Sequence, residues 1–224
     1  MQVLSTHPSD HRGTNALKRA LADIDAPGWC VAFGDRRDML EAVLEQHYKG
    51  VKIVHVGGGE TPRGTLNHMH PDHRTRDAIS MLSRVHFVAN ESCRHRLHRM
   101  GVGIYDDSFV VAVGCPSLDE IVALSKTPAP KRDNTTFEWF PESVAGYRPW
   151  TGPRLSEAEF LHRLRTCGLF RTNSSAGLRE APILGTPVKM VGDRQAGRAP
   201  AGTYHNKEGR ACEEIARICR EICR

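Results

Sequence analysis

Long apolar runs are missing from this chain of 224 residues. No stretch approaches the roughly 18 apolar residues that a membrane helix needs. The polar start over residues 1–11 also lacks the apolar core of a secretory signal, so we expect a cytoplasmic protein. Aromatic residues are scarce, at 6%, but apolar residues reach 39% and charged residues 25%, which is typical of a folded globular chain.

Regular cysteine pairing is also missing. The cysteines number seven, which is odd, and their spacing favours free thiols in a reducing compartment. Three of them share one helical face with two isoleucines near the end of the chain: Cys212, Ile215, Cys219, Ile222 and Cys223. We interpret this stripe as core or as a homodimer contact rather than as a metal site. The net charge of +5 permits a polyanionic partner without requiring one.

Apolar β-branched runs alternate with helical periodicities, which is typical of parallel α/β sheets. The patterns predict strands at 29–33, 51–56, 85–89, 109–113, 169–172 and 188–191. They predict helices at 36–48, 78–82, 91–100, 156–167, 174–181 and 209–224. Residues 126–154 interrupt this rhythm with five prolines and five aromatics. We interpret them as a linker between lobes at 1–125 and 155–224, with aromatics that pack into the lobes or stack on a base or sugar ring.

Ligands of open parallel sheets bind beyond the carboxyl ends of the strands. Three strand exits are polar or rich in glycine: 34–36, 57–60 and 173–177. In the third, small hydroxyl residues at a helix N-terminus suit a phosphate, although the same residues also serve as ordinary caps. The segment 192–198 adds two guanidinium groups that can pair with phosphates. Asp35, in the first exit, is expected to cap the helix that follows it.

Four blocks of sequence carry a resemblance to a known family. They are GDRRDMLEAVL (34–44), KIVHVGGGETPRGTL (52–66), AISMLSRVHFVANES with GCPSLDEI (78–92 and 114–121), and FLHRLRTCGLFRTNSSAGLREAPILGTPVKMVGDRQAGR (160–198). The chain resembles the UDP-N-acetylglucosamine 2-epimerases, especially the hydrolysing branch that forms N-acetylmannosamine. The resemblance implies a compact GT-B-like α/β fold, with two small nucleotide-binding lobes around a cleft and a trimmed first sheet.

The resemblance also implies a binding site for a UDP-sugar substrate, with no further cofactor. Its positions here are Arg36, Asn173, Ser174, Ser175, Gly177, Glu180 and Arg194. By this correspondence the two serines hold the diphosphate, the glutamate binds the ribose hydroxyls and the arginines reach the phosphates. The chemistry agrees, because arginine forks match phosphate oxygens and a carboxylate accepts well from two vicinal hydroxyls.

The catalytic positions of the family are only partly kept. Epimerisation at C2 needs acid–base groups on both faces of the sugar. Asp35 matches the aspartate of the family's GDR motif. Gly57, however, stands where the family has a glutamate, and Asn67 stands where it has a further aspartate. Glu60 is a neighbour of the glutamate position, and the His-Pro motif that opens the family's second lobe is missing, so the resemblance implies a catalytically divergent member.

A histidine-rich segment lies between two blocks of the resemblance. Residues 68–73 read HMHPDH, which fits the HxHxDH pattern of metallo-β-lactamase-type hydrolases. The sequence on both sides follows the epimerases, so we interpret the segment as an inserted loop without a resident metal. The candidates for a local metal site would be His68, His70, Asp72 and His73.

Three functions therefore stay open. A glycosyltransferase would use the nucleotide site and a base such as Asp35, His55 or His70 on an acceptor that is not identified, with modified DNA matching the positive charge. A 2-epimerase, hydrolysing or not, would use Glu60 or a histidine in place of the lost groups. A non-catalytic nucleotide-sugar binding protein is the third. We rank the transferase first and the epimerase second.

Overall fold

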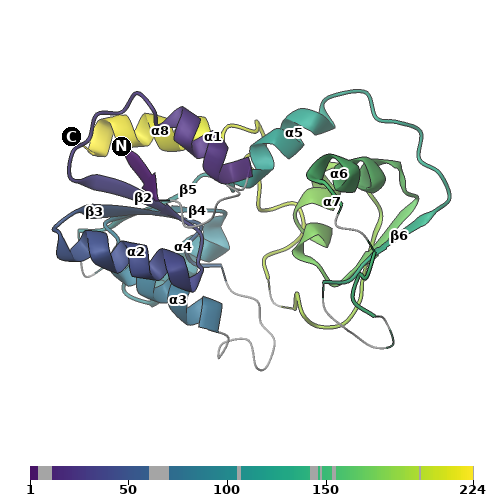
Figure 1. The fold of residues 1–224 in the computed structure, drawn as a ribbon, viewed down its shortest axis with the longest axis horizontal. Coiled ribbons are helices and arrows are strands. Elements are labelled where there is room, and N and C mark those ends of the chain that lie inside the picture. Colours follow the sequence, from purple (N-terminus) through teal and green to yellow (C-terminus); the bar gives the residue numbers. More distant parts are fainter. Residues whose placement is uncertain are drawn as a thin grey trace.

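The computed structural model describes residues 1–4, 12–60, 71–104, 107–141, 146, 148–152, 155–196 and 198–223. The chain forms two lobes (Figure 1), one with a five-stranded sheet and one with a three-stranded sheet. Every described strand pair is parallel. This arrangement confirms the predicted α/β class with two small parallel-sheet lobes. Within the described ranges, no helix is long and apolar enough to cross a membrane.

The first sheet has the strand order β1-β2-β3-β4-β5. Its strands are β1 (Gln2–Leu4), β2 (Trp29–Phe33), β3 (Lys52–Val56), β4 (Val85–Val88) and β5 (Phe109–Ala112). The last four agree with the predicted strands. Their centre is buried because helices cover both faces of the sheet, and this explains the continuous apolar runs in their sequence. β1 was not predicted, since three residues are too short to show a periodicity.

Helices cover both faces of this sheet (Figure 1). α1 (Arg12–Ala20) packs on one face, where its Leu17 meets Val31 of β2. α2 (Arg37–Tyr48) and α3 (Pro71–Met81) pack on the other face, where Met39 meets Ala32 of β2. α3 is longer than the predicted helix over 78–82, because its first two turns are polar and carry no apolar stripe. The lobe also contains α4 (Glu91–Arg99) and η2 (Pro116–Leu118). α5 (Asp119–Ser125) lies between the two lobes, where its Ile121 shares a core cluster with Leu161 and Ile183 of the second lobe.

The second sheet is built from β6 (Thr136–Trp139), β7 (Leu169–Thr172) and β8 (Val188–Met190). β6 lies inside the segment 126–154, so the prediction of a linker there is wrong at 136–139. The aromatic residues explain the difference. The ring centroid of Phe137 lies 5.3 Å from that of Phe170, and Trp139 lies 5.3 Å from Trp150. Phe137 and Trp139 of this segment therefore pack in the core of the second lobe.

The helices of the second lobe agree with the sequence in one case and differ in another. α6 (Glu157–Thr166) begins at a capping box formed by Ser156 and Glu159, as the sequence predicted for its start. The predicted helix over 174–181 is instead two short pieces, η3 (Ser175–Gly177) and α7 (Glu180–Ile183). Pieces this short align few peptide dipoles, so the macrodipole expected to favour a phosphate there is much reduced.

The C-terminal helix α8 (Ala211–Ile222) packs beside α1 on the first lobe, not in the second (Figure 1). The predicted second lobe at 155–224 therefore ends before this helix. Both carboxylate oxygens of Asp119 accept from the first backbone N–H groups of α8, at 3.0 and 2.8 Å. Its cysteines are buried in the core of the first lobe, which agrees with a packing role.

We expect Ile215→Ala to lower the free energy of unfolding by about 3 kcal/mol, because Ile215 is fully buried in the core shared by α1, α8 and the first sheet. Glu213→Ala, an exposed change on the same helix, is the control and should shift stability by less than about 0.5 kcal/mol. Urea denaturation measures both changes. Equal losses in the two variants would mean that α8 does not dock as described.

Candidate functional site

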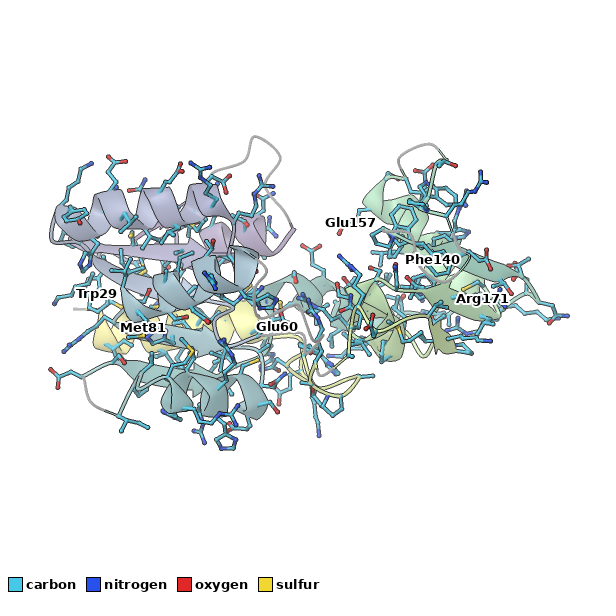
Figure 2. All side chains as sticks on the ribbon, turned by 90° about the horizontal axis from the view of Figure 1, so that it is seen from below. Trp29, Glu60, Met81, Phe140, Glu157 and Arg171 are labelled. Carbon is cyan, nitrogen blue, oxygen red and sulfur yellow. The ribbon has the colours of Figure 1, made fainter. Side chains whose placement is uncertain are left out.

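A cavity of about 360 Å³ lies between the lobes, at the carboxyl ends of the first sheet. The segments after β2, β3 and β5 line one side, and α6 and the start of α7 line the other. Figure 2 shows Glu60 of the first lobe and Glu157 of the second on the facing edges of the two lobes. Gly34 and Gly57 leave their strands with φ values of +118° and +94°, a region that favours glycine. Both glycines line the cavity, and because they have no side chain they leave its volume unfilled.

Asp35 reaches this cavity, but not as the helix cap that the sequence predicted. The N-cap of α2 is Arg36, and the start of the helix has no side-chain cap. Asp35 instead forms an ion pair with Arg76 of α3. The cap prediction is wrong because a buried guanidinium from a distant segment competes for the same carboxylate.

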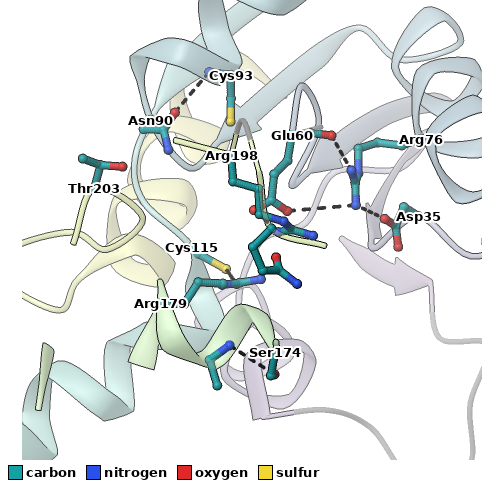
Figure 3. A network of polar contacts seen from close by, with 12 residues as sticks. Asp35, Glu60, Arg76, Asn90, Cys93, Cys115, Ser174, Arg179, Arg198 and Thr203 are labelled. Atoms are coloured by element: carbon teal, nitrogen blue, oxygen red, sulfur yellow. Dashed lines mark hydrogen bonds and ion pairs between the residues drawn. The ribbon is translucent and has the colours of Figure 1, made fainter. Parts of the chain in front are cut away.

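Arg76 joins Asp35 to Glu60 (Figure 3). Its guanidinium donates to the backbone carbonyl of Glu60 and lies 4.0 Å from a carboxylate oxygen of Glu60. The other carboxylate oxygen of Glu60 accepts from Arg198 at 2.9 Å. Burial, and then the nearby charge of Arg198, lower the pKa of Arg76 to about 10, so Arg76 still carries its charge at neutral pH. Two carboxylates are therefore held together on one wall of the cavity.

The opposite wall carries Arg179 and Glu180. Arg179 donates to the sulfur of Cys115 at 2.8 Å and to the hydroxyl of Ser117 at 3.3 Å, which ties the second lobe to the segment after β5. The Cys115 sulfur, and also Glu60 and Glu180, raise the pKa of Arg179. The cavity thus has carboxylates and guanidinium groups on both walls, a set that can bind a polar ligand and move protons.

The other residues predicted for nucleotide binding gather at the carboxyl end of β7, beside the cavity. The hydroxyl of Ser174 accepts from the Ala176 backbone at 3.3 Å, and Ser175 begins η3. Arg194 donates to the carbonyl of Asn173 at 3.3 Å. These residues lie close together, as expected, but only their neighbour Glu180 lines the cavity itself.

Two of the predicted binding positions behave differently. A Cβ on Gly177 would lie 2.5 Å from the sulfur of Met190, so this glycine is needed for close packing of η3 on the sheet. Arg36 is mostly exposed and pairs with Asp38 at 3.2 Å. The structure does not place Arg36 in the cavity.

His55, predicted as a possible base, is fully buried in β3 and does not line the cavity. Its Nδ1 lies 3.0 Å from the hydroxyl of Ser80. Burial, and then the neighbouring His86, lower the pKa of His55 to about 3. The geometry is that of a neutral core histidine.

The histidine-rich segment lies mostly outside the described residues. His68 and His70 are not described, and Asp72 is described only as backbone in α3. His73 is buried in the same helix. Within the described part of the chain, no group of three or more histidine, cysteine, aspartate or glutamate side chains is arranged to hold a metal ion.

The sequence analysis did not single out three residues at the site: Arg76, Cys115 and Arg179. Each acts through a partner far away in the chain, and single arginines and cysteines show no spacing that marks them. Arg198 lay within the block expected to supply guanidinium groups, but its pairing with Glu60 was not foreseen.

A family profile described as UDP-N-acetylglucosamine 2-epimerase matches residues 9–145. The chain belongs to this family. It is 39% identical over 98 residues to a hydrolysing UDP-N,N'-diacetylbacillosamine 2-epimerase of Legionella pneumophila, covering 44% of this chain and 24% of the relative. It is 27% identical over 228 aligned positions to a UDP-N-acetylglucosamine 2-epimerase of Neisseria meningitidis, covering 80% and 59%. The chain thus spans about three fifths or less of the length of these two epimerases.

Solved epimerase structures share the fold. The N. meningitidis enzyme bound to UDP-N-acetylglucosamine has a TM-score of 0.64 at 15% identity, covering 96% of this chain and 84% of that one. The Methanocaldococcus jannaschii enzyme in complex with UDP-N-acetylglucosamine and UDP has a TM-score of 0.63 at 15% identity, covering 95% and 82%. These matches support the expected GT-B-like arrangement of two lobes around a cleft.

The low pKa of His55 predicts how the free energy of unfolding of this epimerase-family chain depends on pH. An unfolded chain binds a proton at this histidine near pH 6.5, whereas folded His55 stays neutral down to about pH 3. The unfolded state therefore binds more protons than the folded state between about pH 3 and pH 6.5. Through His55, the free energy of unfolding rises with pH in this window and does not change with pH above it. We expect His55→Gln to reduce the slope of unfolding free energy against pH by up to about 1.4 kcal/mol per unit.

The measurement is a set of urea denaturation curves between pH 4 and 8. His47→Gln, at an exposed position of α2, is the control and should keep the wild-type slope. A histidine variant at position 55 with an unchanged slope would show that His55 titrates normally in the folded chain.

Proposed function

We propose that the chain binds a UDP-N-acetylhexosamine in the cavity between its lobes and inverts the configuration at C2 of the sugar. The observation that carries this proposal is the meeting of Asp35 and Glu60 at Arg76, on the wall of that cavity. The family of the chain, and the UDP-N-acetylglucosamine held by the solved relatives, support the choice of ligand.

Asp35 and Glu60 are the acid–base groups of this proposal. Inversion at C2 removes a proton from one face of the sugar and returns one to the other. Gly57 removes one carboxylate that the family resemblance implies, and its φ of +94° would strain any side chain placed there. Glu60 brings a carboxylate to the same cavity three residues later.

The nucleotide half of the ligand would lie toward the carboxyl end of β7. Ser174 and Ser175 offer hydroxyl and backbone donors there, and Arg194 offers a guanidinium. Glu180 lines the cavity next to them and is the candidate for the ribose hydroxyls. The sugar would then lie between Asp35 and the second lobe.

A glycosyltransferase, the function ranked first from the sequence, would need the same nucleotide site. The comparisons lend no support to a transferase or to a DNA acceptor, and Glu60 in the cavity removes one argument against the epimerase. A non-catalytic binding protein would bind the UDP-sugar without converting it. One assay separates the three.

We expect purified protein to convert UDP-N-acetylglucosamine into N-acetylmannosamine or its UDP form without any acceptor, in a time course followed by mass spectrometry. Asp35→Asn should slow the conversion at least about a hundredfold, because the amide cannot exchange a proton at neutral pH. Asp38→Asn, on α2 and outside the cavity lining, is the matched control and should keep the wild-type rate.

The same time course is run with hydroxymethylated DNA. A sugar-sized mass increase on the DNA with release of UDP, and no conversion without DNA, would replace the epimerase by the transferase. Unchanged UDP-N-acetylglucosamine in both reactions would contradict the proposed chemistry at this substrate.

UDP binding tests the nucleotide half separately. We expect Ser175→Ala and Arg194→Gln each to weaken UDP about tenfold in calorimetric titrations, because each removes a donor to the phosphates. Arg171→Gln, on β7 and paired with Glu138 at 2.6 Å, is the control and should bind UDP normally. Normal affinity in both test variants would mean that the diphosphate lies elsewhere.

A further inference from the structure

A second cavity, of about 250 Å³, lies on the other side of Glu60 from the first. The start and the last turn of α4 line one side, and the segment 198–204 lines the other. Among the lining residues of the two cavities, only Glu60 is common to both. In Figure 3, Glu60 and Arg198 stand between Arg76 and Cys93, with Arg76 toward the first cavity and Cys93 in the lining of the second.

The lining of this second cavity has more positive than negative charge. Three arginines contribute to it: Arg96, Arg99 and Arg198. Arg96 is neutralised by a two-pronged pair with Asp77, at 2.6 and 2.7 Å, and Arg198 pairs with Glu60. Arg99 is exposed and has no ion pair with any described residue. The guanidinium of Arg99 therefore has no ion-pair partner among the described residues. Nε of Arg198, in the same lining, is buried without a described hydrogen-bond partner.

Tyr204 adds an independent observation. Its side chain is 1% exposed and lines the cavity, yet its hydroxyl has no hydrogen-bond partner among the described residues. Burial, and then the charge of Glu60, raise the pKa of Tyr204 to about 12, so the hydroxyl keeps its proton and is a donor at neutral pH. Buried donors are nearly always hydrogen-bonded in folded proteins. A ligand with acceptor oxygens would satisfy it.

We propose that this cavity binds a phosphate group, as inorganic phosphate or as a small phosphomonoester. Among the lining residues, Tyr204, Arg198 and Arg99 carry the donors for such a ligand: a hydroxyl, an Nε without a described partner and a guanidinium. A phosphate has oxygens for several donors at once, and it carries the negative charge that the lining lacks. Ser92, in the first turn of α4, adds a hydroxyl and the positive end of the helix. The proposal does not depend on the reaction in the first cavity.

Calorimetric titration of the full chain tests it, with inorganic phosphate and glycerol phosphate as the two probes, at fixed ionic strength in a phosphate-free buffer. We expect saturable binding that weakens about tenfold in Arg99→Gln and in Tyr204→Phe. The first change is at an exposed position, and the second keeps the buried ring, so both variants should fold. Arg94→Gln, on the same helix but outside the cavity lining, is the matched control and should bind as the wild type does.

The nucleotide site must be separated from this one, because it too is proposed to hold phosphate. Arg194→Gln should leave phosphate affinity within twofold if the second cavity is the site. Loss in Arg194→Gln without loss in Arg99→Gln would overturn the proposal, as would equal loss in Arg94→Gln or no saturable binding by the wild type. Thermal unfolding of each variant without ligand establishes that it is folded. The tighter of the two probes identifies which source of phosphate the cavity fits.

Discussion

The buried guanidinium of Arg76 is the constraint on which the site depends. A charge that is only 9% exposed is costly unless acceptors surround it. Here the acceptors are the carboxylate of Asp35, at the end of β2, and the carbonyl and carboxylate of Glu60, after β3. One side chain from α3 therefore fixes two strand exits and places their carboxylates side by side. Arg198 extends the pairing from Glu60 to the chain that returns from the second lobe, so the same network links both halves of the molecule.

The parts of the fold that were predicted are those decided locally. Strands β2, β3 and β4 are continuous apolar runs, and α6 begins at a capping box that can be recognised within four residues. β6 was not predicted, because prolines and charges surround it in the sequence. Its place in the core depends on Phe170, which lies far along the chain. The apolar face of α8 was visible as a stripe of cysteines and isoleucines. Periodicity shows that a helix has a buried face, but it does not show which lobe buries it.

For the candidate site too, the sequence indicated the residues that a local pattern marks and missed those that act through distant partners. Asp35 and Glu60 follow strands, Asp35 also matches a motif of the family, and Glu180 belongs to a block that resembles the family, so the nearby sequence marked each of them. His55 also ends a predicted strand but turned out to be core. A parallel strand covered on both faces buries residues on each side, so a polar residue in it does not mark an exposed face. Arg76 and Arg179 act across the fold, and nothing near them in sequence indicates their partners.

The glycine run after β3 explains how a carboxylate can be missing at one position and present nearby. Gly57 turns the chain in the left-handed region, and Gly59 approaches α4 so closely that a Cβ there would overlap the carbonyl of Cys93. These two constraints set the path of the chain, and the next residue along it, Glu60, stands between the two cavities. Arg198 pairs with Glu60 through Nη1 and also lines the second cavity, so one guanidinium joins the carboxylate on the wall of the first cavity to the lining of the second.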